Sequence, residues 1–124
     1  MTSIAPPDRL IVLCTRLVEA TRAGEAEWRA EGEDTYVWER PEGIVAIGTR
    51  DRDGQPPHDL SIFNGAREKV EELASALVED DQPAPWNAPL ADLYLVARRS
   101  ALHADEIIDE LIAALPRQAN APTG

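Results

Sequence analysis

Apolar residues recur every three or four positions between Asp8 and Ala23, and this spacing predicts an amphipathic helix. The stripe consists of Leu10, Leu13, Cys14, Leu17 and Thr21, and it is widened by Ile11 and Val18. Asp8 is suited to cap the start of this helix, and Gly24 is suited to stop it. Residues 1–7 include two prolines next to each other and are predicted to form an extended leader.

The pattern changes to alternation after Glu27, which predicts β-strands. Trp28 and Ala30 alternate with charged neighbours, and the next alternating pair is Tyr36 and Trp38. The letters GED between the pairs supply a turn, so we expect a hairpin. The run GIVAIGTR at 43–50 predicts a further strand, and its two apolar faces indicate that both sides of the sheet are covered.

A proline-containing loop at 51–59 separates this strand from a short strand with the letters LSIF. Asn64-Gly65 follows and is a strong signal for a two-residue hairpin turn. Residues 66–78 fit two structures. Val70, Leu73 and Leu77 have the spacing of a helix, whereas the Asn-Gly turn favours a return strand. We favour the strand and leave the helix open.

The most regular apolar stripe lies near the C-terminus and predicts a long helix over residues 89–115, with Pro89 in its first turn and Pro116 beyond its end. Its members are Leu90, Leu93, Ala97, Ala101, Ala104, Ile108, Leu111 and Leu115. Residues 116–124 are predicted to be a disordered tail. The expected fold is a single two-layer α+β domain over residues 8–115. A four- or five-stranded antiparallel meander packs against an N-terminal helix and a long C-terminal helix.

Composition limits the functions that this fold serves. The 124 residues are the size of one domain, and the net charge of −11 opposes binding to nucleic acid. The chain shows neither a run of about 20 apolar residues nor a secretory signal at its start. The single cysteine, Cys14, fits a reducing compartment, and we expect a cytoplasmic protein in which Cys14 is a buried apolar residue.

Candidate chemistry concentrates on the C-terminal helix, in Arg98, Arg99 and His103. Spacings of four and three place Arg99, His103 and Glu106 on one strip, which is typical of a solvated face with weak ion pairs. The zinc pattern of two histidines at i and i+4 is absent, and no serine lies in a nucleophile elbow. We predict no catalytic residue, cofactor or metal. Arg98 and Arg99 are expected either to clamp the helix to the sheet or to contact a partner.

The three tryptophans differ in their surroundings. Trp28 and Trp38 are expected on neighbouring strands, where they can pack together under a helix. Trp86 lies in the proline-rich segment PAPWNAP. It is expected either to plug an edge of the core or to stay exposed as a partner anchor.

Three segments resemble a family of small uncharacterised bacterial proteins. They are RLVEATRAGEAEW, LSIFNG and LADLYLVARRSALHADEIIDEL, which together span most of residues 8–115. The resemblance implies a helix, an antiparallel sheet and a long C-terminal helix packed back on the sheet. Because the family has no agreed activity, the resemblance assigns no functional residue.

These observations lead to three functional hypotheses. The first is a non-enzymatic accessory or regulatory protein that binds another protein, with a homodimer through Leu95, Val96 or Leu102 of the C-terminal helix as a further expectation. The second is a small-ligand binder or enzyme with a site between the sheet and that helix. The third is an acidic inhibitor that mimics nucleic acid.

Overall fold

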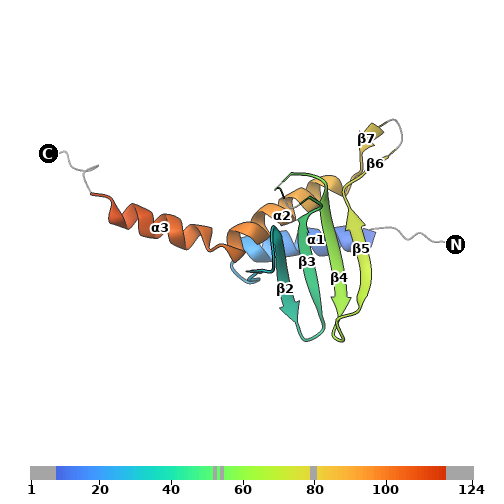
Figure 1. Ribbon diagram of the computed structural model, residues 1–124, viewed down its shortest axis with the longest axis horizontal. Helices are drawn as coiled ribbons and strands as arrows, with labels where there is room; N and C mark the ends of the chain where they lie inside the picture. Colours follow the sequence, from blue (N-terminus) through green and yellow to red (C-terminus); the bar gives the residue numbers. More distant parts are fainter. Residues whose placement is uncertain (1–7, 52, 54, 79–80, 117–124) are drawn as a thin grey trace.

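The computed structural model describes residues 8–51, 53, 55–78 and 81–116, and it has the expected α+β fold. Figure 1 shows one helix at the N-terminal end, a sheet in the middle and two helices at the C-terminal end. The helices are α1 (Asp8–Arg22), α2 (Asn87–Ala101) and α3 (Ala104–Ala114). The strands are β1 (Arg29–Ala30), β2 (Thr35–Arg40), β3 (Gly43–Thr49), β4 (His58–Asn64), β5 (Lys69–Ala74), β6 (Leu77–Val78) and β7 (Gln82–Pro83). The predicted leader at 1–7 and nearly all of the predicted tail lie outside the described residues.

Strands β1 to β5 form one antiparallel sheet in sequence order, so the predicted meander has five strands. The register aligns one apolar row across it, because Tyr36 pairs with Ile47, Ile47 with Leu60, and Leu60 with Leu73. Paired residues share a face in an antiparallel sheet. This row therefore marks the face on which the core forms, and Ile47 and Leu60 in its middle are completely buried.

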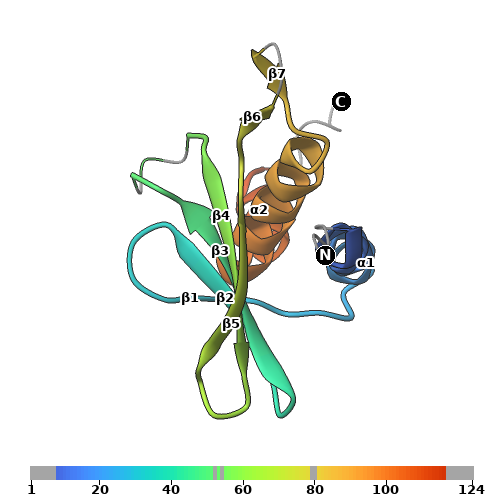
Figure 2. The ribbon, with the colours of Figure 1, turned by 90° about the vertical axis from the view of Figure 1, so that its right-hand side faces the viewer.

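Helices α1 and α2 lie on that face of the sheet, as Figure 2 shows. Helix α2 contacts four of the strands, and α1 packs against α2. Leu90, Leu93 and Ala97, spaced by three and four, are completely buried between them. Cys14 on α1 is also buried, and burial raises the pKa of its thiol to about 11. The prediction of a buried apolar Cys14 is confirmed.

Residues 66–78, for which a helix and a strand were both open, form strand over most of their length, since β5 pairs with β4. The turn before β5 is longer than the two residues predicted. Asn64 accepts a hydrogen bond from the amide of Arg67 (2.9 Å) through its carbonyl, and Arg67 has a positive φ of 69°. A type I turn followed by a left-handed residue makes a three-residue hairpin loop. The side chain of Asn64 adds a hydrogen bond from the amide of Ala66 (2.9 Å), which favours this local turn.

The prediction of one long C-terminal helix is wrong, because the helix breaks at Leu102 and His103 into α2 and α3. Figure 1 shows α3 extending away from the rest of the molecule instead of packing back on the sheet. The apolar spacing continues across the break, and neither glycine nor proline marks it. The break depends on the backbone of His103, which hydrophobic periodicity does not report.

Candidate functional site

The junction between α2 and α3 is built by a left-handed residue that is not glycine. His103 has φ 55° and ψ 43°, and its amide donates to the carbonyl of Ser100 (3.1 Å). The amide of Leu102 donates to the carbonyl of Arg98 (3.0 Å), so two carbonyls in the last turn of α2 have partners. The carbonyl of His103 then accepts from Ile107 (3.0 Å) and begins α3. The hydrogen bonds that end α2 therefore reach His103, the same residue whose carbonyl begins α3.

Two ion pairs bridge this junction. Arg99 on α2 pairs with Asp105 on α3, and Nδ1 of His103 lies 3.2 Å from Oε1 of Glu106. Asp105 and Glu106 also occupy the first turn of α3, where the helix dipole favours negative charge. All four side chains are more than half exposed, so each pair contributes at most about 1 kcal/mol. Of the predicted strip, His103 and Glu106 are paired, whereas Arg99 pairs with Asp105, which the strip did not include.

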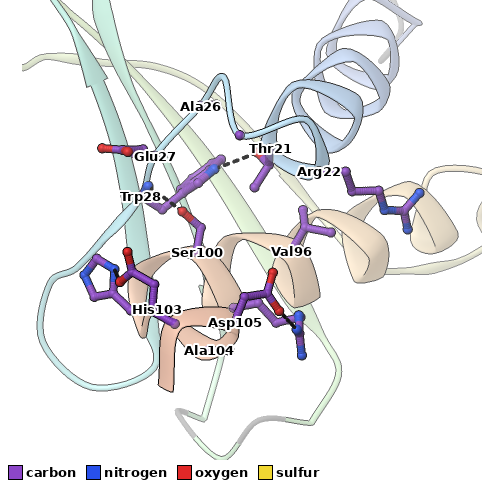
Figure 3. Close-up of a pocket in the computed structure, with 13 residues that line it drawn as sticks. Thr21, Arg22, Ala26, Glu27, Trp28, Val96, Ser100, His103, Ala104 and Asp105 are labelled. Carbon is purple, nitrogen blue, oxygen red and sulfur yellow. Dashed lines mark hydrogen bonds and ion pairs between the residues drawn. The ribbon is translucent and has the colours of Figure 1, made fainter. Parts of the chain in front are cut away.

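A pocket of about 370 Å³ lies between the C-terminal end of α1, the segment after it, and the junction. Figure 3 shows Trp28 in this pocket. The indole nitrogen of Trp28 donates to the hydroxyl of Thr21 (2.9 Å), and its amide donates to the hydroxyl of Ser100 (3.0 Å). The lining side chains in the described part of the chain include Arg99 and His103, but not Arg98. Arg99 and His103 face carboxylates of their own chain, and Arg22 and Glu27 line the pocket beside them.

Arg98 lies instead toward a buried group of tyrosines. It lowers the pKa of Tyr36 on β2 and of Tyr94 on α2, against the stronger effect of burial, which raises both pKa values. The hydroxyl of Tyr94 donates to Oδ1 of Asp34, and the hydroxyl of Thr49 donates to Oδ2 of the same carboxylate. Arg98 itself is exposed, and its effect on both phenols places it nearer to the tyrosines of α2 and β2 than to the junction pocket.

His58 completes this buried cluster. Its ring centroid lies 4.9 Å from that of Tyr94, and the ring centroid of Tyr36 lies 6.0 Å from that of Tyr94. Burial lowers the pKa of His58, although Asp34 and Asp59 act in the opposite direction. The sequence analysis did not identify this cluster. The sequence features that could have indicated this cluster are the chain's only two tyrosines and a histidine next to a predicted strand. Nothing in the spacing of these residues shows that they meet.

The cluster connects elements that are far apart in the sequence and places a carboxylate, a histidine and two phenols within contact of each other. Each of these groups is buried or half-buried, and none lines the described pockets. A reacting group needs room for a substrate beside it. The cluster therefore has the geometry of a structural polar network.

Trp86 is half-buried at the edge of the core, where it packs against the buried cluster. Its indole nitrogen donates to the carbonyl of Ala74 at the end of β5 (2.8 Å). The next residue, Asn87, bonds both backbone groups of Ala76, at 2.8 and 3.0 Å. Of the two alternatives expected for Trp86, the geometry supports a side chain that fills the edge of the core, not an exposed partner anchor. Trp28 is buried in the core, although it lies just before β1 and not on a strand, and Trp38 on β2 is half-buried against the core.

Helix α3 carries more exposed large apolar side chains than either of the other two helices of the described chain. It contains no buried residue, and the large aliphatic side chains on it and at its end are between 45% and 64% exposed. These residues are Ile107, Ile108, Leu111, Ile112 and Leu115, here called the α3 stripe. Their spacing puts them on one side of the helix. Leu95 and Leu102, two of the residues expected in a dimer, are also exposed, whereas Val96 is half-buried against the core.

Within the described residues, no helix is both long and apolar enough to cross a membrane. The same part of the chain contains no group of three or more histidine, cysteine, aspartate or glutamate side chains that could hold a metal ion. The α3 stripe and the junction pocket are therefore the two features that remain to be assigned.

Comparison with known proteins adds no assignment to these features. No family model matches the chain, and neither a curated protein nor a solved structure matches it.

Proposed function

We propose that this chain is a non-enzymatic accessory or regulatory protein that binds another protein through the α3 stripe. One observation carries the proposal: α3 holds a row of large aliphatic side chains in solvent and buries none of them in its own domain. An exposed apolar surface of this kind is typical of an interaction site. The buried Cys14 and the expected cytoplasmic location are compatible with such a role.

The stripe has enough apolar surface to matter for affinity. Fully burying a leucine or isoleucine side chain is worth about 1.5–3 kcal/mol, so covering five that are about half exposed gains roughly 4–7 kcal/mol before the costs of association. A micromolar complex requires about 8 kcal/mol of net binding free energy. The stripe can therefore supply a large part of a moderate affinity, with the partner's contacts to the flanks of α3 supplying the rest.

The length of α3 supports the same role. An isolated helix shorter than about 12 residues is marginally stable in water, and α3 has 11 residues, none of which is buried. Most helices of this length are stabilised by burying an apolar face. A partner that covers the stripe would provide that burial.

The test compares two glutamine variants of the full chain. The first replaces Ile108, Leu111 and Ile112 on the stripe, and the matched control replaces Val12, Leu77 and Leu95, which are similarly exposed on other elements. Glutamine keeps the charge unchanged and is a good helix former. In-cell cross-linking in the native host, followed by mass spectrometry, is expected to give adducts of defined mass with the natural chain and the control. The stripe variant should lose them while keeping the melting temperature of the natural protein.

The proposal fails if the stripe variant and the natural chain give the same adducts, or if the natural chain gives none. Loss of the adducts in both variants would also contradict it, because the contact would then not be specific to α3.

The junction pocket supports a second candidate, a site for a small anionic ligand. It combines Arg99 and His103 with the Trp28 indole in a volume of about 370 Å³. A ligand would have to displace Asp105 from Arg99 and Glu106 from His103. Titration with phosphate and acetate, followed by the NMR signal of the Trp28 indole N–H, tests this site. A shift that vanishes in His103→Gly, which keeps the break between the helices, supports it, and an unchanged signal rejects it.

A further inference from the structure

We infer that the partner of α3 is a basic protein with an apolar groove whose walls contain lysine or arginine. The inference rests on the proposed function and specifies its partner. It follows from the charges around the stripe. Residues 104–115 contain four carboxylates, Asp105, Glu106, Asp109 and Glu110, and neither lysine nor arginine.

The carboxylates border the stripe on both sides. Residues three apart are neighbours on a helix surface, so Asp109 lies next to Ile112 and Glu110 lies next to Ile107. Asp105 and Glu106 are engaged by Arg99 and His103. Asp109 and Glu110 have no ion-pair partner within the described residues. A groove that covers the stripe would bring its walls against these two carboxylates, and cationic walls would complement them.

A second copy of this chain does not fit as the occupant. Pairing two α3 stripes would bring four carboxylates from each copy to one interface without a lysine or arginine from either helix. Each copy also has a net charge of −11. The contact area is small as well, because α3 is only about 16 Å long at 1.5 Å per residue and about 10 Å wide. A stable interface buries about 800 Å² on each partner, which a flat pair of such faces does not reach.

The sheet of a second copy is no better matched. An apolar groove at the ends of β2 to β5 includes Trp38, Ile62 and Val70. Carboxylates outnumber cations near it, since the hairpin segments 39–42 and 67–72 contain five glutamates against two arginines and one lysine. Seating the acidic α3 there would bring like charges together.

A membrane surface is the third possible occupant of an amphipathic helix. Helices that lie in membrane interfaces are rich in lysine and arginine on their polar face, and cytoplasmic leaflets are anionic. The polar face of α3 has the opposite sign. Charge therefore selects a basic protein groove from the three, in the mode where an amphipathic helix inserts its apolar face into a groove.

The experiment measures binding of fluorescent helical probe peptides to the full chain by anisotropy. One probe consists of leucine and lysine, and its twin consists of leucine and glutamate at the same positions. The lysine probe is expected to bind, and the glutamate probe is not. The stripe glutamine variant should bind the lysine probe about tenfold more weakly. The control with Val12, Leu77 and Leu95 replaced should stay within about twofold. Asp109→Asn with Glu110→Gln should weaken binding about fivefold, and this loss should disappear at high salt.

Three results would overturn the inference. The first is equal binding of the lysine probe by the stripe variant and the natural chain, which would mean that only net charge attracts it. The second is a dimer in sedimentation velocity that the stripe substitutions dissolve, which would make a second copy the occupant. The third is stripe-dependent binding to vesicles of phosphatidylcholine, alone or with phosphatidylserine. If in-cell adducts depend on the stripe but not on Asp109 and Glu110, the proposed function stands and this inference fails.

Discussion

The hydroxyl of Tyr94 on α2 donates a hydrogen bond to the carboxylate of Asp34, 60 residues earlier in the chain. Asp34 lies in the turn before β2 with a positive φ of 50°, and its other oxygen accepts from Thr49 at the end of β3. One carboxylate therefore joins a turn, a strand and a helix. Burial and the hydrogen bond to Asp34 both raise the pKa of Tyr94, which keeps the phenol protonated as the donor.

Tyr94→Phe removes this donor and leaves a partly buried carboxylate with one partner fewer. Hydrogen bonds to charged groups contribute about 1.5–3 kcal/mol, so we expect the free energy of unfolding to fall by about 2 kcal/mol. Urea unfolding followed by tryptophan fluorescence measures the change. Combining Tyr94→Phe with Asp34→Ala should cost less than the sum of the two single changes. Additive costs would show that the two side chains do not interact.

His58 makes stability depend on pH. Burial lowers its pKa in the folded protein, so the unfolded chain binds a proton at a higher pH than the folded one. The free energy of unfolding should therefore be highest above pH about 6.5, the pKa of an unperturbed histidine, and fall as the pH decreases below it. The decrease should level off once the folded state is protonated as well.

His58→Gln should remove most of this pH dependence between pH about 8 and 5.5, and urea unfolding of the variant and of the natural chain over that range measures it. An unchanged pH profile in His58→Gln would mean that His58 does not cause the dependence.

The outcome for Arg98 and Arg99 shows what periodicity predicts and what it does not. Neighbours on a helix point about 100° apart, so one spacing pattern covers both residues. In the structure, Arg98 lies toward Tyr36, whereas Arg99 pairs with Asp105 across the junction. The pairing of Asp34 with Tyr94 could not be predicted from spacing either, because it depends on how a turn and a distant helix meet in space.

The core was predictable for a physical reason. Burial is the same requirement for every member of a stripe or row, so Leu90, Leu93 and Ala97 follow from spacing alone. The break in the C-terminal helix was not, since it arises from the left-handed backbone of a histidine and not from a glycine or proline. The apolar spacing of the C-terminal segment continues past the break, and the sequence therefore does not show that α3 leaves the core.

Trp86 provides a direct test of a plug against a partner anchor. Trp86→Phe keeps an aromatic ring but removes the hydrogen bond to the carbonyl of Ala74. We expect the free energy of unfolding to fall by about 1 kcal/mol, with no change in binding of the leucine–lysine probe. Thermal unfolding and anisotropy measure the two effects. A loss of binding without a loss of stability would instead make Trp86 a partner contact.

The junction predicts opposite effects for two small substitutions at His103. A left-handed conformation costs a residue with a Cβ roughly 1–2 kcal/mol, and glycine avoids this cost. His103→Gly should therefore keep the break, as reported by non-helical Cα chemical shifts at 102–103. His103→Ala adds the best helix former and should shift the population toward one continuous helix over 87–114. Equal chemical shifts in the two variants would mean that residue 103 does not control the break.

Helix α3 should exchange its amide hydrogens much faster than α2 in the free protein. Leu90, Leu93 and Ala97 of α2 are completely buried, so exchange there requires opening of the core. Helix α3 buries nothing, and a helix of 11 residues without packing opens at little cost in free energy. Hydrogen exchange with mass spectrometry should show exchange in 105–115 at least about a hundredfold faster than in 90–100, and slower exchange in 105–115 after the leucine–lysine probe is added. Equal protection of the two helices in the free protein would mean that α3 is already packed on another surface.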